Sequence, residues 1–152
     1  MVMGMLKKFE IIDHPSDIGI RLVTESIEEF FEFSAWGMFS IMCDIERVKP
    51  AVKRVVRITE NEQLSLEELL VIWLEKLLYI FEVKKMLFCK FGVNNIEICN
   101  DSTFLGAEIS GEKINTLKHE LTVSIKAPTY HMLKLAKDRH TGNWEGQIIF
   151  DV

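Results

Sequence analysis

The strongest constraint on the fold is a helical pattern of large apolar residues near the middle of the chain. Ser65 and Glu68 have the spacing of a capping box, which satisfies backbone N–H groups that the first helical turn leaves free. The apolar positions recur at the spacing of one helix face: Leu66, Leu69, Leu70, Trp73, Leu74, Leu77, Leu78 and Phe81. A stripe this dense needs a core to cover it. The spacing therefore predicts a core-facing helix over residues 66–81.

A second helix is predicted earlier in the chain, over residues 27–42. Ser26 and Glu29 repeat the spacing of a capping box. The apolar stripe that follows consists of Ile27, Phe30, Phe31, Ala35, Met38, Phe39 and Met42. Its aromatic and methionine content is more typical of a packed core than of a cofactor site.

The remaining sequence consists of short apolar runs separated by turn residues such as Asn, Asp and Gly, which is typical of strands. We predict strands at residues 9–12, 18–23, 52–58, 86–91, 96–99, 103–109, 121–126, 130–136 and 144–151. Two helices with about nine strands, mostly linked as hairpins, predict an α+β fold in which two amphipathic helices pack on a mainly antiparallel sheet.

The composition is that of a globular domain. Of the 152 residues, 48% are hydrophobic and 27% are charged. A chain of this length buries roughly two-thirds of its unfolded surface, so it needs neither a disulfide nor a structural metal to fold. We therefore expect one domain over residues 1–152.

Charge and cysteine usage disfavour several functional classes. The net charge is −5 and the Lys and Arg residues are scattered along the sequence. Because binding to phosphates needs clustered cations, we expect no tight direct RNA binding. Cys43, Cys89 and Cys99 are odd in number and widely spaced, which predicts buried, reduced thiols and a cytoplasmic location. Since no stretch approaches the ~20 apolar residues of a transmembrane helix, we expect no membrane association.

Sequence motifs of the common catalytic sites are absent: there is no G-x-S-x-G, no Gly-rich phosphate loop and no H-E-x-x-H. Polar residues that the strand pattern does not need stand at three places. His14 and Asp17 lie in the first inter-strand loop, Asp151 follows the last apolar strand, and Lys126 precedes a Pro-led turn. Each is explained equally well as a turn residue or a solvated chain end. An imidazole and a carboxylate this close also suit a metal site or acid–base chemistry.

Taken together, five segments resemble the archease family, and the resemblance spans residues 9–152. The segments are His14-Pro-Ser-Asp17-Ile-Gly19, Ser26-Ile-Glu-Glu-Phe30 followed by Ala35-Trp-Gly-Met-Phe39, Leu69-Leu-Val-Ile-Trp-Leu74, Lys126-Ala-Pro-Thr-Tyr-His131, and Trp144 with a terminal strand ending in Asp151. Each segment alone is a weak signal, whereas their order and spacing together are specific.

The resemblance implies an accessory factor of an RtcB-type RNA ligase, an enzyme that joins RNA ends in tRNA splicing and RNA repair. Such a factor is not itself an enzyme but promotes guanylylation of the ligase histidine and multiple turnover. The resemblance also implies a metal site in which Asp17 meets Asp151. Two carboxylates repel at close range unless a divalent cation such as Ca²⁺ or Mg²⁺ lies between them. His14 and Lys126 are expected to orient this site or to contact the partner.

The sequence departs from the family pattern at two positions near Lys126. Most archeases carry Glu two residues before the motif lysine, where this chain has Ser124. They also carry an aliphatic residue where this chain has Pro128. The missing glutamate removes a candidate acidic contact from the metal site.

Two alternatives from other functional classes stay open. One is a free-standing metal-dependent phosphoester hydrolase, in which two carboxylates and a histidine activate water. The other is a chaperone-like interaction module. A turnover assay on generic phosphoesters with Mg²⁺ or Mn²⁺ tests the first, and a holdase assay on unrelated clients tests the second.

Overall fold

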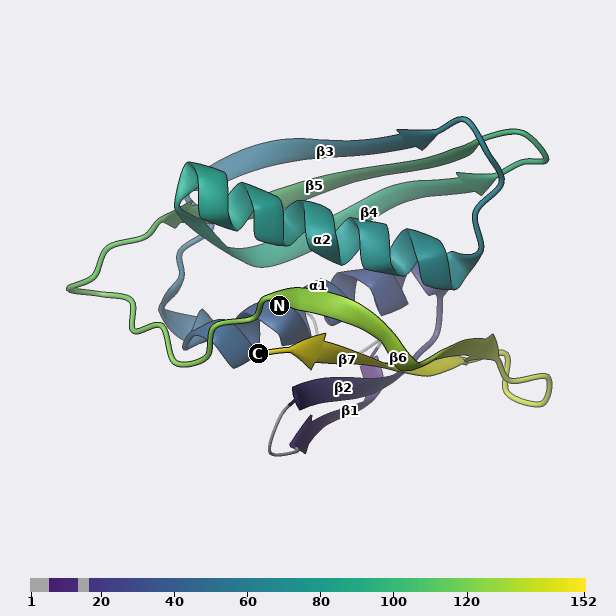
Figure 1. Ribbon diagram of the computed structural model, residues 1–152, viewed down its shortest axis with the longest axis horizontal. Helices are drawn as coiled ribbons and strands as arrows, with labels where there is room; N and C mark the ends of the chain where they lie inside the picture. Colours follow the sequence, from purple (N-terminus) through teal and green to yellow (C-terminus); the bar gives the residue numbers. More distant parts are fainter. Residues whose placement is uncertain (1–5, 14–16) are drawn as a thin grey trace.

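A computed structural model describes residues 6–13 and 17–152, and it places two helices between two antiparallel sheets (Figure 1). In chain order the elements are β1 (Leu6–Asp13), β2 (Asp17–Thr24), α1 (Ile27–Met42), the short 3-10 helix η1 (Ile45–Arg47), β3 (Val52–Glu60), α2 (Leu66–Lys84), β4 (Met86–Ile98), β5 (Thr103–Lys113), β6 (Ala127–Lys137) and β7 (Trp144–Asp151). The predicted α+β class, with two amphipathic helices and antiparallel strands, is confirmed.

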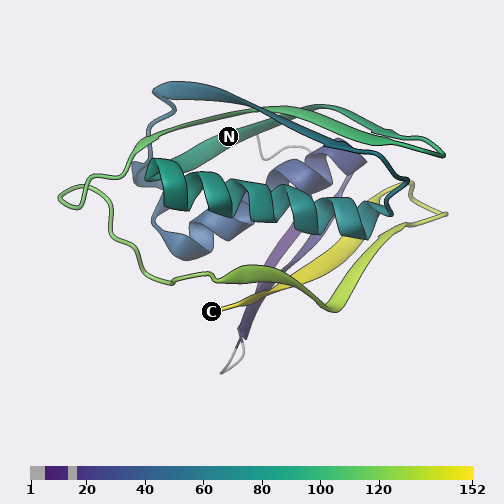
Figure 2. The same ribbon diagram turned by 45° about the horizontal axis from the view of Figure 1, so that its top comes forward.

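The strands form a four-stranded sheet in the order β1-β2-β7-β6 and a three-stranded sheet in the order β3-β5-β4. All neighbouring strands are antiparallel. After β2 the chain leaves the four-stranded sheet, builds both helices and the whole three-stranded sheet, and returns with β6 and β7 (Figure 2). Segments from the two ends of the chain therefore become neighbours in one sheet.

The core lies between the sheets and surrounds both helices. Residues with no more than 1% exposure are contributed by every layer: Ile20, Leu22, Ile148 and Phe150 from the four-stranded sheet, Leu105 and Ile109 from the three-stranded sheet, and Phe30, Phe31, Phe39, Leu69, Leu70, Trp73, Leu74 and Leu77 from the helices. The Trp73 indole N–H also donates a hydrogen bond of 3.0 Å to the backbone carbonyl of Phe31, which links the two helices. Both predicted stripes therefore face the core.

The predicted α2 is confirmed, and its first turn is built as its sequence indicates. The Glu68 N–H donates to Ser65 Oγ at 3.1 Å, and the Ser65 N–H donates to Glu68 Oε1 at 2.9 Å. The helix runs beyond residue 81 to Lys84 and ends where Lys85 adopts a left-handed conformation with φ of 53°.

In the described part of the chain, no helix is long and apolar enough to cross a membrane.

The predicted α1 has the expected bounds but only half of the expected capping box. The Glu29 N–H donates to Ser26 Oγ at 3.1 Å, which satisfies one free donor of the first turn. The Glu29 carboxylate, however, accepts from the Ser26 hydroxyl at 2.7 Å. The Glu29 carboxylate is therefore bonded to the Ser26 hydroxyl, and not to the Ser26 backbone N–H as in a full capping box.

Two of the strand predictions are wrong. Residues 121–126 form no strand, because this segment crosses between the sheets and bonds to the end of α1: the Thr122 N–H donates to the Met42 carbonyl at 2.9 Å. The runs 86–91 and 96–99 are not two strands, because β4 continues from Met86 to Ile98 through Asn94 and Asn95, with an irregularity in register between Val93 and Asn95. Within the described residues the sheets thus have seven strands.

The expectation of three buried thiols is correct only for Cys43. Cys89 is half-buried and Cys99 is exposed. Cys99 follows the end of β4, where its N–H donates to the Ser102 carbonyl at 2.8 Å in the turn toward β5. An apolar run that ends in a hairpin turn no longer faces the core.

Replacing Leu70 or Trp73 by Ala should lower the free energy of unfolding by roughly 2–5 kcal/mol, the range for truncating a large core side chain. Both side chains are fully buried. Urea unfolding measures the effect, with Trp73→Phe as a control that keeps most of the apolar volume but loses the indole hydrogen bond and part of the ring. Changes below about 0.5 kcal/mol at both positions would place the stripe on the surface.

Candidate functional site

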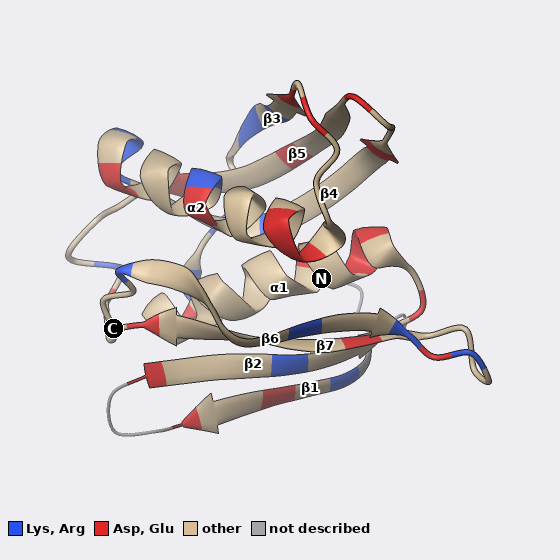
Figure 3. Cartoon of the chain, turned by 45° about the vertical axis from the view of Figure 1, so that its right-hand side comes forward, with Lys and Arg blue, Asp and Glu red and all other residues tan. Residues whose placement is uncertain are grey.

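The pairing of β2 with β7 places Asp17 directly opposite Asp151. In an antiparallel pair, directly opposed residues project to the same face of the sheet with Cβ atoms about 4.5–5.5 Å apart. In Figure 3 the acidic start of β2 and the acidic end of β7 lie side by side. The two predicted ligands from opposite ends of the sequence therefore stand next to each other at one end of the sheet.

The two aspartates lie on the outer face of this sheet. Their neighbours Ile18, Ile20, Ile148 and Phe150 alternate with them along the strands and pack in or against the core. Asp17 and Asp151 consequently point away from the helices. Asp17 is half-buried and Asp151 is exposed, so the pair is open to solvent or to a partner.

One carboxylate oxygen of Asp17 makes no hydrogen bond within the described residues. Asp17 Oδ1 is buried and has no hydrogen-bond donor among residues 6–13 and 17–152. A buried acceptor of this kind is destabilising unless something compensates its charge. With Asp151 opposite, the donor set is two hard carboxylate oxygens, which fits Ca²⁺ or Mg²⁺. Within the described ranges no third His, Cys, Asp or Glu joins the two, so water and backbone carbonyls would complete the coordination.

Gly19 allows the two strands to approach closely beside the aspartate pair. A Cβ atom added at Gly19 would lie 2.7 Å from the Ile148 carbonyl oxygen and 2.5 Å from Ile149 Cδ1. Instead, the Ile149 side chain lies over Gly19 and is only 4% exposed on this outer face. The glycine of the Asp17-Ile-Gly19 motif thus has a positioning role that the motif alone does not reveal.

Lys126 is brought next to Asp151 through the backbone. The Lys126 N–H donates to the Asp151 carbonyl at 2.8 Å, and Ala127 is the register partner of Asp151. The side chains of Lys126 and Ser124 are exposed, and within the described part of the chain that of Lys126 makes no ion pair. The other predicted residue, His14, lies outside the described residues.

Glu112, which the sequence did not single out, anchors the connection that delivers Lys126 to the site. Its Oε2 accepts from the Lys118 ammonium at 2.7 Å, from the Lys49 N–H at 2.8 Å and from His119 Nε2 at 2.9 Å. His119 Nδ1 accepts from the Asn115 N–H at 2.9 Å, which assigns the ring proton to Nε2. The hydrogen bonds from Lys118, Lys49 and His119 lower the pKa of the Glu112 carboxyl to about 2.

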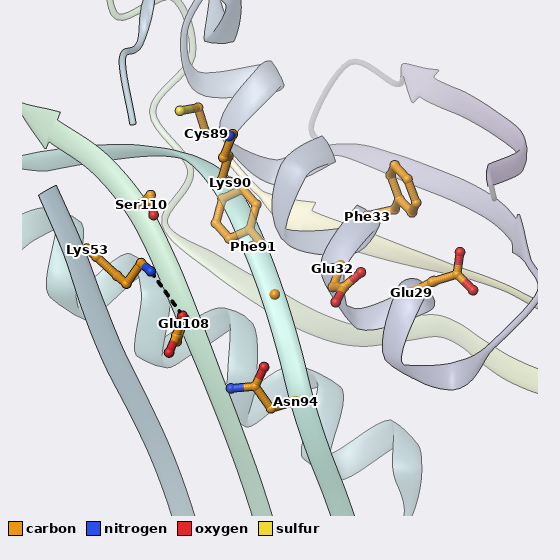
Figure 4. A pocket seen from close by; sticks show the side chains of 11 residues that line it. Glu29, Glu32, Phe33, Lys53, Cys89, Lys90, Phe91, Asn94, Glu108 and Ser110 are labelled. Atoms are coloured by element: carbon orange, nitrogen blue, oxygen red, sulfur yellow. Dashed lines mark ion pairs between the residues drawn. The ribbon is translucent and has the colours of Figure 1, made fainter. Parts of the chain in front are cut away.

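A separate hollow of about 450 Å³ lies between α1 and β4 and contains none of the predicted site residues (Figure 4). Most of its charged side chains bond to other groups of the protein. Glu32 accepts from the Val93 N–H at 2.7 Å, and Lys53 pairs with Glu108 at 3.4 Å. Burial, with the nearby charges of Glu29 and Glu28, raises the pKa of the Glu32 carboxyl. Glu32 thus occupies a free donor on the edge of β4, which protects that edge.

Cys43 is not suited to nucleophilic chemistry. Burial, followed by the charge of Asp44, raises the pKa of its thiol to about 11. The thiol therefore stays protonated at neutral pH, and the thiolate is the reactive form.

Comparison with known proteins identifies the family. The model of the archease protein family (MTH1598/TM1083) matches residues 9–152. The chain is 38% identical to protein archease of Methanosarcina mazei, over 96% of this chain and 97% of that protein. It is 37% identical to protein archease of Pyrococcus abyssi, over 97% of this chain and 100% of that protein. The chain belongs to the archease family.

The archease fold is supported by a solved structure as well. The solution structure of Methanobacterium thermoautotrophicum protein 1598 matches with a TM-score of 0.76 and 30% sequence identity, and the match covers 95% of this chain and 98% of that one. The resemblance inferred from the five segments is therefore confirmed. Asp17 and Asp151 both lie within the part of the chain that the archease family model matches.

Glu112→Gln should make the stability of this archease less sensitive to acid. The pKa of Glu112 is about 2 in the folded protein, whereas a glutamate in an unfolded chain titrates near 4.3. Because the folded value is the lower one, its stabilisation is complete above about pH 4.3 and is lost as the pH falls through about 2. At neutral pH the substitution should cost on the order of 1 kcal/mol, since the group is partly solvated.

Denaturant unfolding at neutral pH and near pH 3 measures this difference. Glu120→Gln is the matched control, because Glu120 lies on the same connection and is exposed. The gap between the wild type and Glu112→Gln should narrow at the lower pH, while the control follows the wild type. An equal pH dependence in all three proteins would show that the Glu112 contacts do not stabilise the fold.

Proposed function

We propose that this archease-family protein is a non-catalytic accessory factor of an RtcB-type RNA ligase and acts in the cytoplasm in tRNA splicing and RNA repair. It would promote guanylylation of the ligase and multiple turnover, the role that the family implies. The observation that carries the proposal is the Asp17–Asp151 pair, with a buried Asp17 oxygen that lacks a partner in the described residues. An outward-facing pair of this kind suits a contact with another protein better than an internal structural role.

The physical logic of such a factor is differential binding. To accelerate the ligase it must bind the conformation that accepts the nucleotide more tightly than the resting one. A factor that bound both conformations equally would shift nothing. The residues that discriminate between the two conformations should therefore lie on the surface that meets the ligase.

In this proposal Asp17 and Asp151 hold a divalent cation, Ca²⁺ or Mg²⁺, and Gly19 keeps their strands close. The cation would neutralise the two carboxylates and present a positive charge at the surface. Lys126 would contact the ligase or the carboxylates from its position just before β6, and His14 would orient the loop that precedes Asp17. In the described residues, no contact favours the hydrolase or the chaperone-like module over this proposal.

Asp17→Ala and Asp151→Ala should abolish stimulation of the ligase and leave the fold largely intact. Each variant removes one of two hard ligands, and it also relieves repulsion between the carboxylates in the metal-free protein. Guanylylation and turnover of the ligase are measured with each variant, beside melting curves with and without Ca²⁺ or Mg²⁺. The cation should raise the melting temperature of the wild type and not of the variants.

Asp101→Ala is the matched control for the aspartate variants. Asp101 is exposed in the turn between β4 and β5, far along the chain from both aspartates, and its loss should leave stimulation unchanged. Lys126→Ala should weaken stimulation without abolishing it. Full stimulation by Asp17→Ala would contradict the proposal for this site. The similarity to the family would then extend to the fold and not to this site.

The isolated protein should bind RNA no more tightly than a dissociation constant of ~10⁻⁴–10⁻⁶ M at physiological salt, the range of non-specific binding. Its acidic balance, with 23 Asp and Glu against 18 Lys and Arg, opposes tight binding to phosphates. Titration of a labelled tRNA in the absence of ligase measures the constant. Nanomolar affinity would make the protein an RNA-binding module in its own right.

A further inference from the structure

A hollow of about 270 Å³ between α2 and the edge strand β3 is lined by basic residues, although the protein as a whole is acidic. Its lining includes Arg54 and Arg57 from β3 and Lys76 and Lys84 from α2, and no acidic residue. In Figure 3, blue segments appear on both elements. For a chain with a net charge of −5, a surface lined by four cations and no anion is a local exception.

The charged groups of these four residues are not paired with acidic side chains in the described part of the chain. In the part of the chain that the structure describes, none of their side chains takes part in an ion pair or a side-chain hydrogen bond. By contrast, Lys53 on the same strand pairs with Glu108 at 3.4 Å. Charges on β3 also protect a free sheet edge, and a cation in the last helical turn suits the helix dipole. Neither reason accounts for Lys76 in the middle of α2.

The same hollow carries an exposed aromatic ring. Tyr79 is 60% exposed, and two apolar residues of the same lining, Val55 and Val83, are 56% and 54% exposed. These side chains are too exposed to serve the core. Cations along a groove with an aromatic ring among them are the combination that binds single-stranded nucleic acid, because phosphates pair with the cations and a base stacks on the ring. An acidic peptide would use the cations and leave the ring without a role.

We propose that this hollow binds the phosphodiester backbone of single-stranded RNA, with Arg57 and Lys76 contacting phosphates and Tyr79 stacking on a base. The hollow borders the three-stranded sheet, whereas the aspartate pair lies on the four-stranded sheet. The RNA contact therefore stands or falls independently of the metal site. With so few cations the binding is weak, with a dissociation constant of ~10⁻⁴–10⁻⁶ M. Such a contact would orient RNA that is held by another protein.

The test is binding of a fluorescein-labelled oligouridine, followed by anisotropy over a series of salt concentrations. For single strands the logarithm of the binding constant falls with the logarithm of salt by about 0.7 for each phosphate contacted. The double variant Arg57→Gln/Lys76→Gln should therefore reduce the slope by about 1.4. Tyr79→Ala should weaken binding about fivefold or more at every salt concentration and leave the slope unchanged.

Lys137→Gln is the matched control, because Lys137 is an exposed lysine at the end of β6 in the other sheet. It should bind as the wild type does. A slope that is equal in the double variant and the control, or full binding by Tyr79→Ala, would overturn the proposal. Displacement of the oligouridine by polyglutamate at matched charge concentration would also overturn it and assign the hollow to an acidic protein segment.

The ligase assay separates this proposal from the proposed function. All three substituted side chains are exposed, so the variants should melt with the wild type. Stimulation of the ligase on a substrate too short to reach the hollow should persist in the double variant even where oligouridine binding is lost. That result would support an RNA contact that is separate from the activating site, whereas loss of both would overturn the separation.

Discussion

The antiparallel pairing of β2 with β7 is the contact on which the candidate site depends. Its register runs without interruption from Asp17 opposite Asp151 to Thr24 opposite Trp144. Because side chains alternate between the faces of a sheet, a slip by one residue would turn the buried Ile20 and Ile148 outward and the aspartates inward. The burial of apolar side chains on the inner face thus holds the two carboxylates together on the outer face.

This dependence ties the site to the whole fold. Between β2 and β7 the chain forms both helices and the entire three-stranded sheet, so the aspartates are brought together from opposite ends of the sequence by the packing of all these elements. The return to the four-stranded sheet runs through residues 114–126, which belong to no strand of either sheet and include one isolated bridge from Leu121 to Cys43. Glu112 and the Met42 carbonyl hold this connection at two points. Hydrogen bonds far from the aspartates therefore help to place Lys126 beside them.

The sequence predicted local structure well and long-range structure poorly, for physical reasons. The Ser65–Glu68 box and the stripe after it are local signals, and α2 forms where they stand. The segment 121–126 has the apolar content of a strand, but its partner is the end of α1, which no local pattern reveals. The Asp17–Asp151 pairing was expected only from family resemblance, because strand order depends on packing. Glu112 was missed because one of its donors, Lys49, lies 63 residues away.

The distribution of charge shows why net charge constrains function less than it first suggests. The sequence scatters its Lys and Arg residues, yet folding gathers four of them around one hollow without an acidic neighbour in the lining. The aspartate pair lies on the other sheet, and the two helices lie between the sheets (Figure 1). One helix is about 10 Å across, and at physiological salt charges are screened over about 8 Å. Charges separated by more than this screening length affect each other little, so the local charge of a surface says more about what it can bind than the net charge does.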